Sequence, residues 1–174
     1  MERGTEMKHK CALIVVKDME RSRKFYEELL GQKVILDFGA NITFAGDFCL
    51  QTQESWRDFI GESGNTIMYR PNNMELYFEE KYFDRFVEKL RAYDNVEILH
   101  DVKEYSWGQR VVRFYDPDHH IIEVGESMIQ VIKRFDQLGM SVEEIAERTQ
   151  HPEEFVRAAL KEKIQKRLVG FRCS

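Results

Sequence analysis

The feature that most constrains the fold is a duplication, because one order of predicted elements occurs twice along the chain. The first copy predicts a strand, a helix and three strands, at 11–16, 19–30, 34–38, 41–45 and 48–52. The second copy predicts the same series at 75–79, 82–93, 96–100, 110–115 and 120–124. A repeat of a whole supersecondary unit constrains the fold more than any single motif does.

Local signals support each element of the repeat. The apolar run CALIVV predicts a buried strand, and Asp18 is a suitable N-cap for the helix that follows. Phe25 and Leu29 lie at helical spacing, and Gly31 stands where a C-cap glycine is common. The stretch 53–73, which joins the copies, has no readable period.

These patterns predict an α+β fold with two βαβββ modules, at about 8–52 and 74–126. We expect the modules to form a cupped mixed sheet with the helices on its convex side. We therefore assign 1–126 to one domain and 127–174 to a helical extension. A chain of 174 residues with 43% hydrophobic residues is long enough for such a core.

The extension has a purely helical pattern, with predicted helices at 128–138, 142–148 and 152–168. Ser141 and Glu144 form a capping-box signature, and Pro152 fits the first turn of a helix. Helices this short are marginal alone, so we expect them to pack on their own domain or on a partner chain. GMSVEEIAERTQHPEEFVRAAL also resembles a small helix-turn-helix, but Glu153 and Glu154 stand where DNA phosphates would approach.

The net charge and the cysteine content limit which partners and which cellular location the sequence predicts. The net charge is −5, so the chain as a whole does not indicate nucleic-acid binding, although the locally basic tail leaves that alternative open. Three cysteines without a CxxC spacing, a charged N-terminus and no apolar run of roughly 20 residues predict a cytoplasmic protein without a membrane partner.

Two strings carry a family resemblance. CALIVVKDMERSRKFYEELLG resembles the opening of the vicinal oxygen chelate superfamily, which includes glyoxalase, bleomycin-resistance and extradiol dioxygenase proteins. RVVRFYDPDHHIIEVGE resembles the end of the same fold. The resemblance covers about residues 8–126 and implies a small-molecule ligand and, as is common in the fold, a homodimer.

The resemblance also implies four metal-ligand positions, which fall on Cys11, Gln51, Glu75 and Glu123. Members of the family usually have histidine at the first and third of these positions. A thiolate, an amide and two carboxylates can still bind a divalent metal, and Zn²⁺ fits such a mixed set. Two carboxylates directed into one cup would raise each other's pKa unless a cation pairs with them. We therefore expect either no cofactor or a divalent metal, and Glu123 is the candidate catalytic residue.

Ligand-binding candidates are Trp107, Arg110, Glu75 and Gln51. Trp107 and Arg110 would supply an aromatic wall and a cation for a polar or anionic ligand. Three functions follow from these residues. The first is binding of a small molecule in the cup without the standard metal site. The alternatives are a metal-dependent lyase, isomerase or dioxygenase, and a ligand-sensing regulator that uses the C-terminal helices.

Overall fold

The computed structural model describes residues 7–61 and 66–170, and it describes only the backbone of 162–170. The chain divides into two compact units. The first unit contains the N-terminal module through Asn72 and also Asp116–His120. The second contains Asn73–Tyr115 and the chain from Ile121 onward. Arg172 and Cys173 lie outside the described residues.

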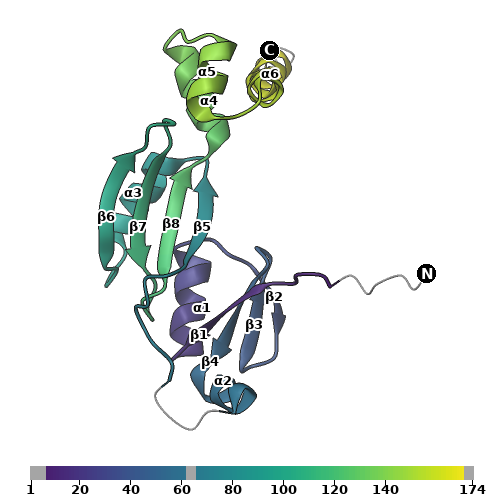
Figure 1. The fold of residues 1–174 in the computed structure, drawn as a ribbon. Coiled ribbons are helices and arrows are strands. Elements are labelled where there is room, and N and C mark those ends of the chain that lie inside the picture. The colour runs from purple at the N-terminus through teal and green to yellow at the C-terminus, as the bar shows by residue number, and fades with distance from the viewer. Residues whose placement is uncertain (1–6, 62–65, 171–174) are drawn as a thin grey trace, which may run out of the picture. The chain divides into compact units, whose positions relative to one another are not determined.

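The first module is a four-stranded mixed sheet with a helix on one face (Figure 1). Its elements are β1 (Ala12–Val16), α1 (Met19–Glu28), β2 (Val34–Asp37), β3 (Asn41–Phe44), β4 (Phe48–Thr52) and α2 (Gln53–Ile60). The strand order is β1-β4-β3-β2, with β1 parallel to β4 and the other pairs antiparallel. Asp18 caps α1 by accepting a hydrogen bond from the Arg21 amide. Tyr26 of α1 is fully buried and lies in ring contact with Phe44 and Phe48 of the sheet.

The turn Asp116–His120 belongs to this first unit although it follows the seventh strand. Asp118 accepts hydrogen bonds from the Lys17 amide, the Arg21 guanidinium and the Ser22 hydroxyl, at 3.2, 2.8 and 3.2 Å. The Tyr26 hydroxyl donates to Asp116 at 2.9 Å, and burial followed by the negative charge of Asp116 raises the pKa of Tyr26. The turn is therefore bound to α1 and to the residue before its N-cap by polar contacts, of which those of Ser22 and Tyr26 are buried.

The second module repeats the order of the first. Its elements are β5 (Glu75–Glu80), α3 (Phe83–Ala92), β6 (Ile98–Glu104), β7 (Arg110–Tyr115) and β8 (Ile121–Glu126). The strand order β5-β8-β7-β6 matches that of the first module, with β5 parallel to β8. Phe83, Phe86, Val87 and Leu90 form the buried side of α3, and Phe86 lies in ring contact with Phe114 of β7.

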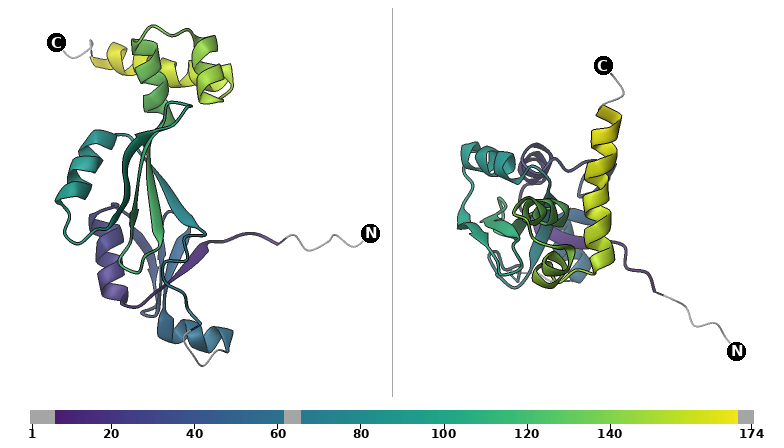
Figure 2. Two further views of the ribbon diagram at one scale, coloured as in Figure 1. Left: turned by 60° about the vertical axis from the view of Figure 1, so that its left-hand side comes forward. Right: turned by 90° about the horizontal axis from the view of Figure 1, so that it is seen from above.

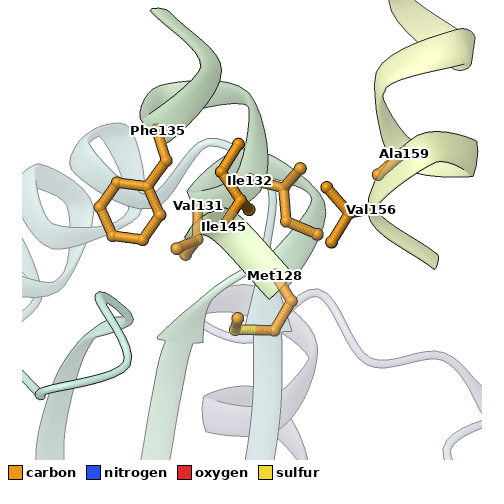
Figure 3. Packing of buried hydrophobic residues seen from close by; sticks show 7 residues of the cluster. All are labelled: Met128, Val131, Ile132, Phe135, Ile145, Val156 and Ala159. Atoms are coloured by element: carbon orange, nitrogen blue, oxygen red, sulfur yellow. The ribbon is translucent and has the colours of Figure 1, made fainter. Parts of the chain in front are cut away.

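Three helices complete the second unit: α4 (Met128–Gln137), α5 (Val142–Thr149) and α6 (Glu153–Gly170). They pack around a shared apolar cluster, whose buried side chains are shown in Figure 3. The cluster contains Met128, Val131, Ile132, Phe135, Ile145, Val156 and Ala159. The predicted capping box is present, with Ser141 and Glu144 each bonded to the other's backbone amide.

The helical unit also packs on its own module, which is one of the two alternatives expected from its apolar spacing. Trp107 lies against the cluster. Gly108 lies so close to Phe135 that a Cβ atom there would stand 2.1 Å from the ring. Arg134 donates hydrogen bonds to the Gly108 carbonyl and to Glu126 at 2.5 and 3.1 Å. Figure 2 shows α4 continuing directly from the end of β8.

The predicted α+β class, the two βαβββ modules and the C-terminal helices are confirmed. The helix α2 was not predicted, and β6 runs from Ile98 to Glu104 where we expected 96–100. Within the described residues, no helix has both the length and the apolar character needed to cross a membrane.

Candidate ligand-binding site

The second sheet has a polar cluster on the face opposite α3. Residues alternate between faces along a strand, so Val112 and Phe114 face the helix while Arg113 points the other way. The pairing register sets Arg113 beside Glu123 of β8 on one side and His100 of β6 on the other. Tyr77 of β5 is the parallel partner of Glu123. We call Glu75, Tyr77, His100, Arg113 and Glu123 the polar face of the second module.

Arg113 is the centre of this polar face. Its Nε donates to Glu75 Oε2 at 2.8 Å, and its Nη2 forms an ion pair with Glu123. Its Nη1 contacts the Tyr105 hydroxyl at 2.7 Å and His100 Nε2 at 3.1 Å. Burial favours a lower pKa for Arg113, but the hydrogen bonds to Glu75 and Tyr105 outweigh it and raise the pKa. The guanidinium therefore remains charged and neutralises carboxylates on both sides.

His100 acts as a hydrogen-bond acceptor toward Arg113. Its Nδ1 lies 2.8 Å from the carbonyl oxygen of Asp101, which can only accept, so Nδ1 carries the proton. The lone pair of Nε2 then accepts from Arg113. We assign this tautomer from the hydrogen-bond network. The side chain fixes the orientation of the guanidinium without adding positive charge.

Tyr77 forms the exposed part of the polar face, with a residue exposure of 48%. Its hydroxyl accepts from Gln109 Nε2 at 2.7 Å and donates to Glu79 Oε1 at 3.0 Å. Burial of the phenol and the negative charge of Glu79 raise the pKa of Tyr77 to about 12, although the Gln109 hydrogen bond opposes them. A Cβ atom at Gly125 would stand 2.7 Å from Gln109 Nε2, so this glycine makes room for the Gln109–Tyr77 contact.

In the first unit, Cys11 and Gln51 are bonded to neighbouring side chains. The sulfurs of Cys11 and Cys49 lie 2.8 Å apart. The hydrogen bond to Cys49 and burial raise the pKa of Cys11, with smaller effects from the charges of Cys49 and Asp47. Gln51 is buried and accepts from Asn41 at 2.8 Å.

These contacts do not fit a metal centre of the expected kind. A metal ligand at Cys11 must be a thiolate, but the environment of that thiol resists loss of its proton. Glu75 and Glu123 are already paired with Arg113, whose positive charge occupies the place that a cation would need. Among the described residues, no group of three His, Cys, Asp or Glu side chains has the arrangement to hold a metal ion.

The two remaining candidates, Trp107 and Arg110, are not members of the polar face. Trp107 stacks on Tyr105 with ring centroids 4.6 Å apart and packs against the C-terminal helical cluster. Arg110 lies on the α3 side of the sheet and forms ion pairs with Asp84 and Glu126 at 2.8 and 3.0 Å. The structure therefore places Arg110 on the opposite side of the sheet from Glu75 and Glu123. Trp107 borders the polar face, because Tyr105 contacts Arg113 and because Trp107 Nε1 donates to Gln109 Oε1 at 3.2 Å.

Sequence reasoning missed Arg113, the central residue of the polar face. A signal for it was present in the hairpin of β7 and β8. Arg113 and Glu123 each lie five residues from Asp118, and antiparallel strands pair residues equidistant from the turn. Tyr77 and His100 had no comparable local signal, because their neighbours come from other strands.

A family model for the glyoxalase-like domain matches residues 9–129. The chain therefore belongs to the glyoxalase-like domain family. The match ends just inside α4, so most of the C-terminal helical unit lies beyond it. A search of curated proteins found no match.

Solved structures of the same fold support this assignment. A protein of unknown function from Agrobacterium tumefaciens is 37% identical, covers 71% of this chain and 96% of its own, and gives a TM-score of 0.65. A glyoxalase/bleomycin resistance protein/dioxygenase from Nocardioides is 20% identical over 71% of this chain and 85% of its own, with a TM-score of 0.56. A glyoxalase-related enzyme from Fulvimarina pelagi is 21% identical over 70% and 91%, with a TM-score of 0.57. The last two likenesses concern the fold alone.

Proposed function

We propose that this protein binds a small polar molecule on the polar face of the second module, without a metal ion of the kind expected for the family. The observation that carries the proposal is the position of Arg113 between Glu75 and Glu123. An internal guanidinium there supplies the positive charge that two adjacent carboxylates require. The alternative of a metal-dependent lyase or dioxygenase has no comparable support.

The chemistry of the face indicates the class of ligand. The donors of Arg113 are directed to Glu75, Glu123, His100 and Tyr105. Glu75, with a side chain 37% exposed, and Tyr77 present acceptor oxygens to solvent. Glu79 adds a further exposed carboxylate. A ligand that carries hydroxyl or ammonium donors is complementary to such a face.

The regulator alternative has weaker support in the C-terminal helices. Arg157, near the start of α6, forms ion pairs with Glu143 and Glu153 at 3.2 and 2.8 Å. The first turn of α6 also carries Glu154. An acidic helix start with its nearest arginine already paired is unfavourable for contact with DNA phosphates. A cytoplasmic location and a homodimer remain our predictions from composition and family resemblance.

The ligand proposal is tested by ligand-observed NMR with a panel of small amines, amino sugars and polyols, in the presence and absence of EDTA. We expect binding that EDTA does not change and that Glu75→Gln and Tyr77→Phe each weaken several-fold. Glu88→Gln, at an exposed position of α3, is the matched control and should bind as the wild type does. Elemental analysis of untagged protein should find no stoichiometric divalent metal.

Two results would contradict the proposal. One is a metal present at one ion per chain whose removal abolishes binding. The other is a set of ligands whose affinities are unchanged by both Glu75→Gln and Tyr77→Phe.

A further inference from the structure

A cavity lies on the α3 side of the second sheet, opposite the polar face. It is a cavity of about 400 Å³ where the start of α3, the Arg110–Glu126 pair and one side of α4 come together. Four of its eleven lining residues, Gln130, Lys133, Arg134 and Gln137, lie beyond residue 129, where the family match ends. The cavity therefore depends on the C-terminal helices that this chain adds to the family domain.

The wall from α4 is a consequence of the amphipathic pattern of that helix. Val131, Ile132 and Phe135 are buried in the apolar cluster of the C-terminal helices. Gln130 and Lys133 lie on the remaining side and line the cavity. One face of α4 thus packs on α5 and α6, and the other presents amide and ammonium groups to the cavity.

The cavity carries an excess of positive charge. Its lining has five cationic residues, namely Lys81, Arg85, Arg110, Lys133 and Arg134, against two carboxylates, Asp84 and Glu126.

Two of the cations are neutralised within the protein. Arg110 pairs with Asp84 and Glu126, and hydrogen bonds to Glu126 and Asp84 raise the pKa of Arg110. Arg134 pairs with Glu126 and, at 3.4 Å, with Glu104. These ion pairs hold the floor of the cavity in place.

Lys81 and Arg85 differ from those two arginines. Lys81 contacts the ring of Tyr82, with its ammonium 4.9 Å from the centroid, and has no carboxylate partner among the described residues. Arg85 is exposed and likewise forms no ion pair within the described part of the chain. Both charges are available to a ligand.

We infer that this cavity binds a small anion with several negative charges, of the phosphate or polycarboxylate class. Lys81 and Arg85 are two separate cations, so a ligand must carry at least two negative charges to pair with both of them. The side-chain amides of Gln130 and Gln137 can donate hydrogen bonds to further oxygen atoms of the ligand. This inference is independent of the ligand proposed for the polar face, since the two sites share no residue.

The inference is tested on the full chain by isothermal titration with inorganic pyrophosphate and, separately, with citrate. We expect one site per chain for at least one of these probes, with an affinity that falls as salt concentration rises. The double variant Lys81→Gln/Arg85→Gln should weaken binding by at least about tenfold, because two charge-assisted contacts are lost. Backbone amide signals of 81–85 and 130–137 should shift on titration of the wild type.

A variant with the same type of substitution elsewhere is the control. Lys24→Gln removes an exposed positive charge from α1 and should leave the affinity for both probes unchanged. The inference is wrong if neither probe binds, or if the double variant and Lys24→Gln weaken binding equally. It is also wrong if the shifted amides lie outside 81–85 and 130–137. Preference for pyrophosphate or for citrate distinguishes the phosphate from the carboxylate source of the same chemistry.

Discussion

At the scale of single residues, the pair Cys11 and Cys49 shows how one neighbour sets the chemistry of a thiol. Cys11 is only half-buried, yet its hydrogen bond to Cys49 raises its pKa, and burial and negative charges act in the same direction. Thiolate is the nucleophile and the metal-binding form, so a raised pKa reduces both activities near neutral pH. The thiol for which the family resemblance implied a metal-binding role is therefore held in its unreactive form.

This gives a prediction for alkylation by iodoacetamide, followed at Cys11 by peptide mass spectrometry. The rate should be low at pH 7.5 and should rise steeply as the pH approaches the raised pKa. Cys49→Ala removes the largest cause of the shift, so it should increase the rate at pH 8 several-fold. Thr43→Val changes the other neighbour of Cys49, 3.4 Å from its sulfur, and should leave the rate unchanged. Equal rates for the wild type and Cys49→Ala would show that Cys49 does not control this thiol.

The outcome for the candidate site residues also has a residue-scale explanation. Glu75 and Glu123 were predicted as a pair, and the structure places both on Arg113. Trp107 and Arg110 were added because they stand at the start of a strand that crosses the cup in the fold implied by the family resemblance. However, alternation along β7 sends Arg110 to the α3 face, and the loop places Trp107 against α4 and its neighbours. Strand parity could have separated Arg110 from the others, but the docking of Trp107 depends on contacts distant in sequence.

At the scale of elements, the attachment of α4 depends on one glycine. Gly108 has φ +86°, a conformation that other residues adopt only with strain, and its missing side chain leaves the space that Phe135 fills. Gly139 has the nearly identical φ of +85°, but a Cβ atom there would meet nothing within 4 Å. A comparison of the two glycines therefore distinguishes the cost of backbone strain, which both positions share, from the cost of a steric conflict, which arises only at Gly108.

Substitution of each glycine by alanine should therefore give different losses of stability in urea. Gly139→Ala should lower the free energy of unfolding by about 1 kcal/mol, from backbone strain alone. Gly108→Ala adds a steric conflict with Phe135, and overpacking of this kind costs about 1–3 kcal/mol more. If the two variants lose equal stability, Phe135 does not pack on Gly108 as described.

The elements that sequence analysis identified are those with a strong apolar period. The helices α1 and α3 each bury several large side chains, and their spacing gave their positions. The helix α2 has no buried residue, so the sequence contains no strong apolar stripe that would predict it. Its C-cap, Gly61 in the left-handed conformation, was the available signal, because glycine is common at that position.

At the scale of the whole molecule, the turn Asp116–His120 connects parts of the chain that are far apart in sequence. The duplicated element order predicted both modules, because each module is defined by local periods and turns. The membership of this turn in the first unit was not predictable in that way. Its contacts join residues about a hundred positions apart, and no local pattern specifies such a pairing.

Asp118 gives the test of this connection, because its side chain is fully buried and satisfies three donors. Asp118→Ala would leave the Lys17 amide and the Ser22 hydroxyl without their acceptor and remove the partner of Arg21. The Ser22 hydroxyl is buried, and a buried donor left unsatisfied costs about 1–3 kcal/mol. Together with the loss of the Lys17 and Arg21 contacts, we expect a loss of about 3 kcal/mol in urea unfolding.

The control for this variant is Asp101→Ala. Asp101 also pairs with an arginine, Arg91, but both side chains are more than half exposed. An exposed ion pair contributes little, so this variant should unfold close to the wild type. Equal stability for Asp118→Ala and Asp101→Ala would mean that the turn does not hold the first unit together.

The same turn affects the order in which parts of the chain fold during synthesis on the ribosome. Synthesis proceeds from the N-terminus, and domains generally fold as they emerge. The first unit cannot complete its contacts in this way, because the acceptor of Lys17 and Ser22 is Asp118, which is made 101 and 96 residues later. Until then α1 has exposed donors and an incomplete anchor, and closing so long a loop is slow. The N-terminal module is therefore the first to be synthesised, yet its contacts with this turn form only after most of the chain has been made.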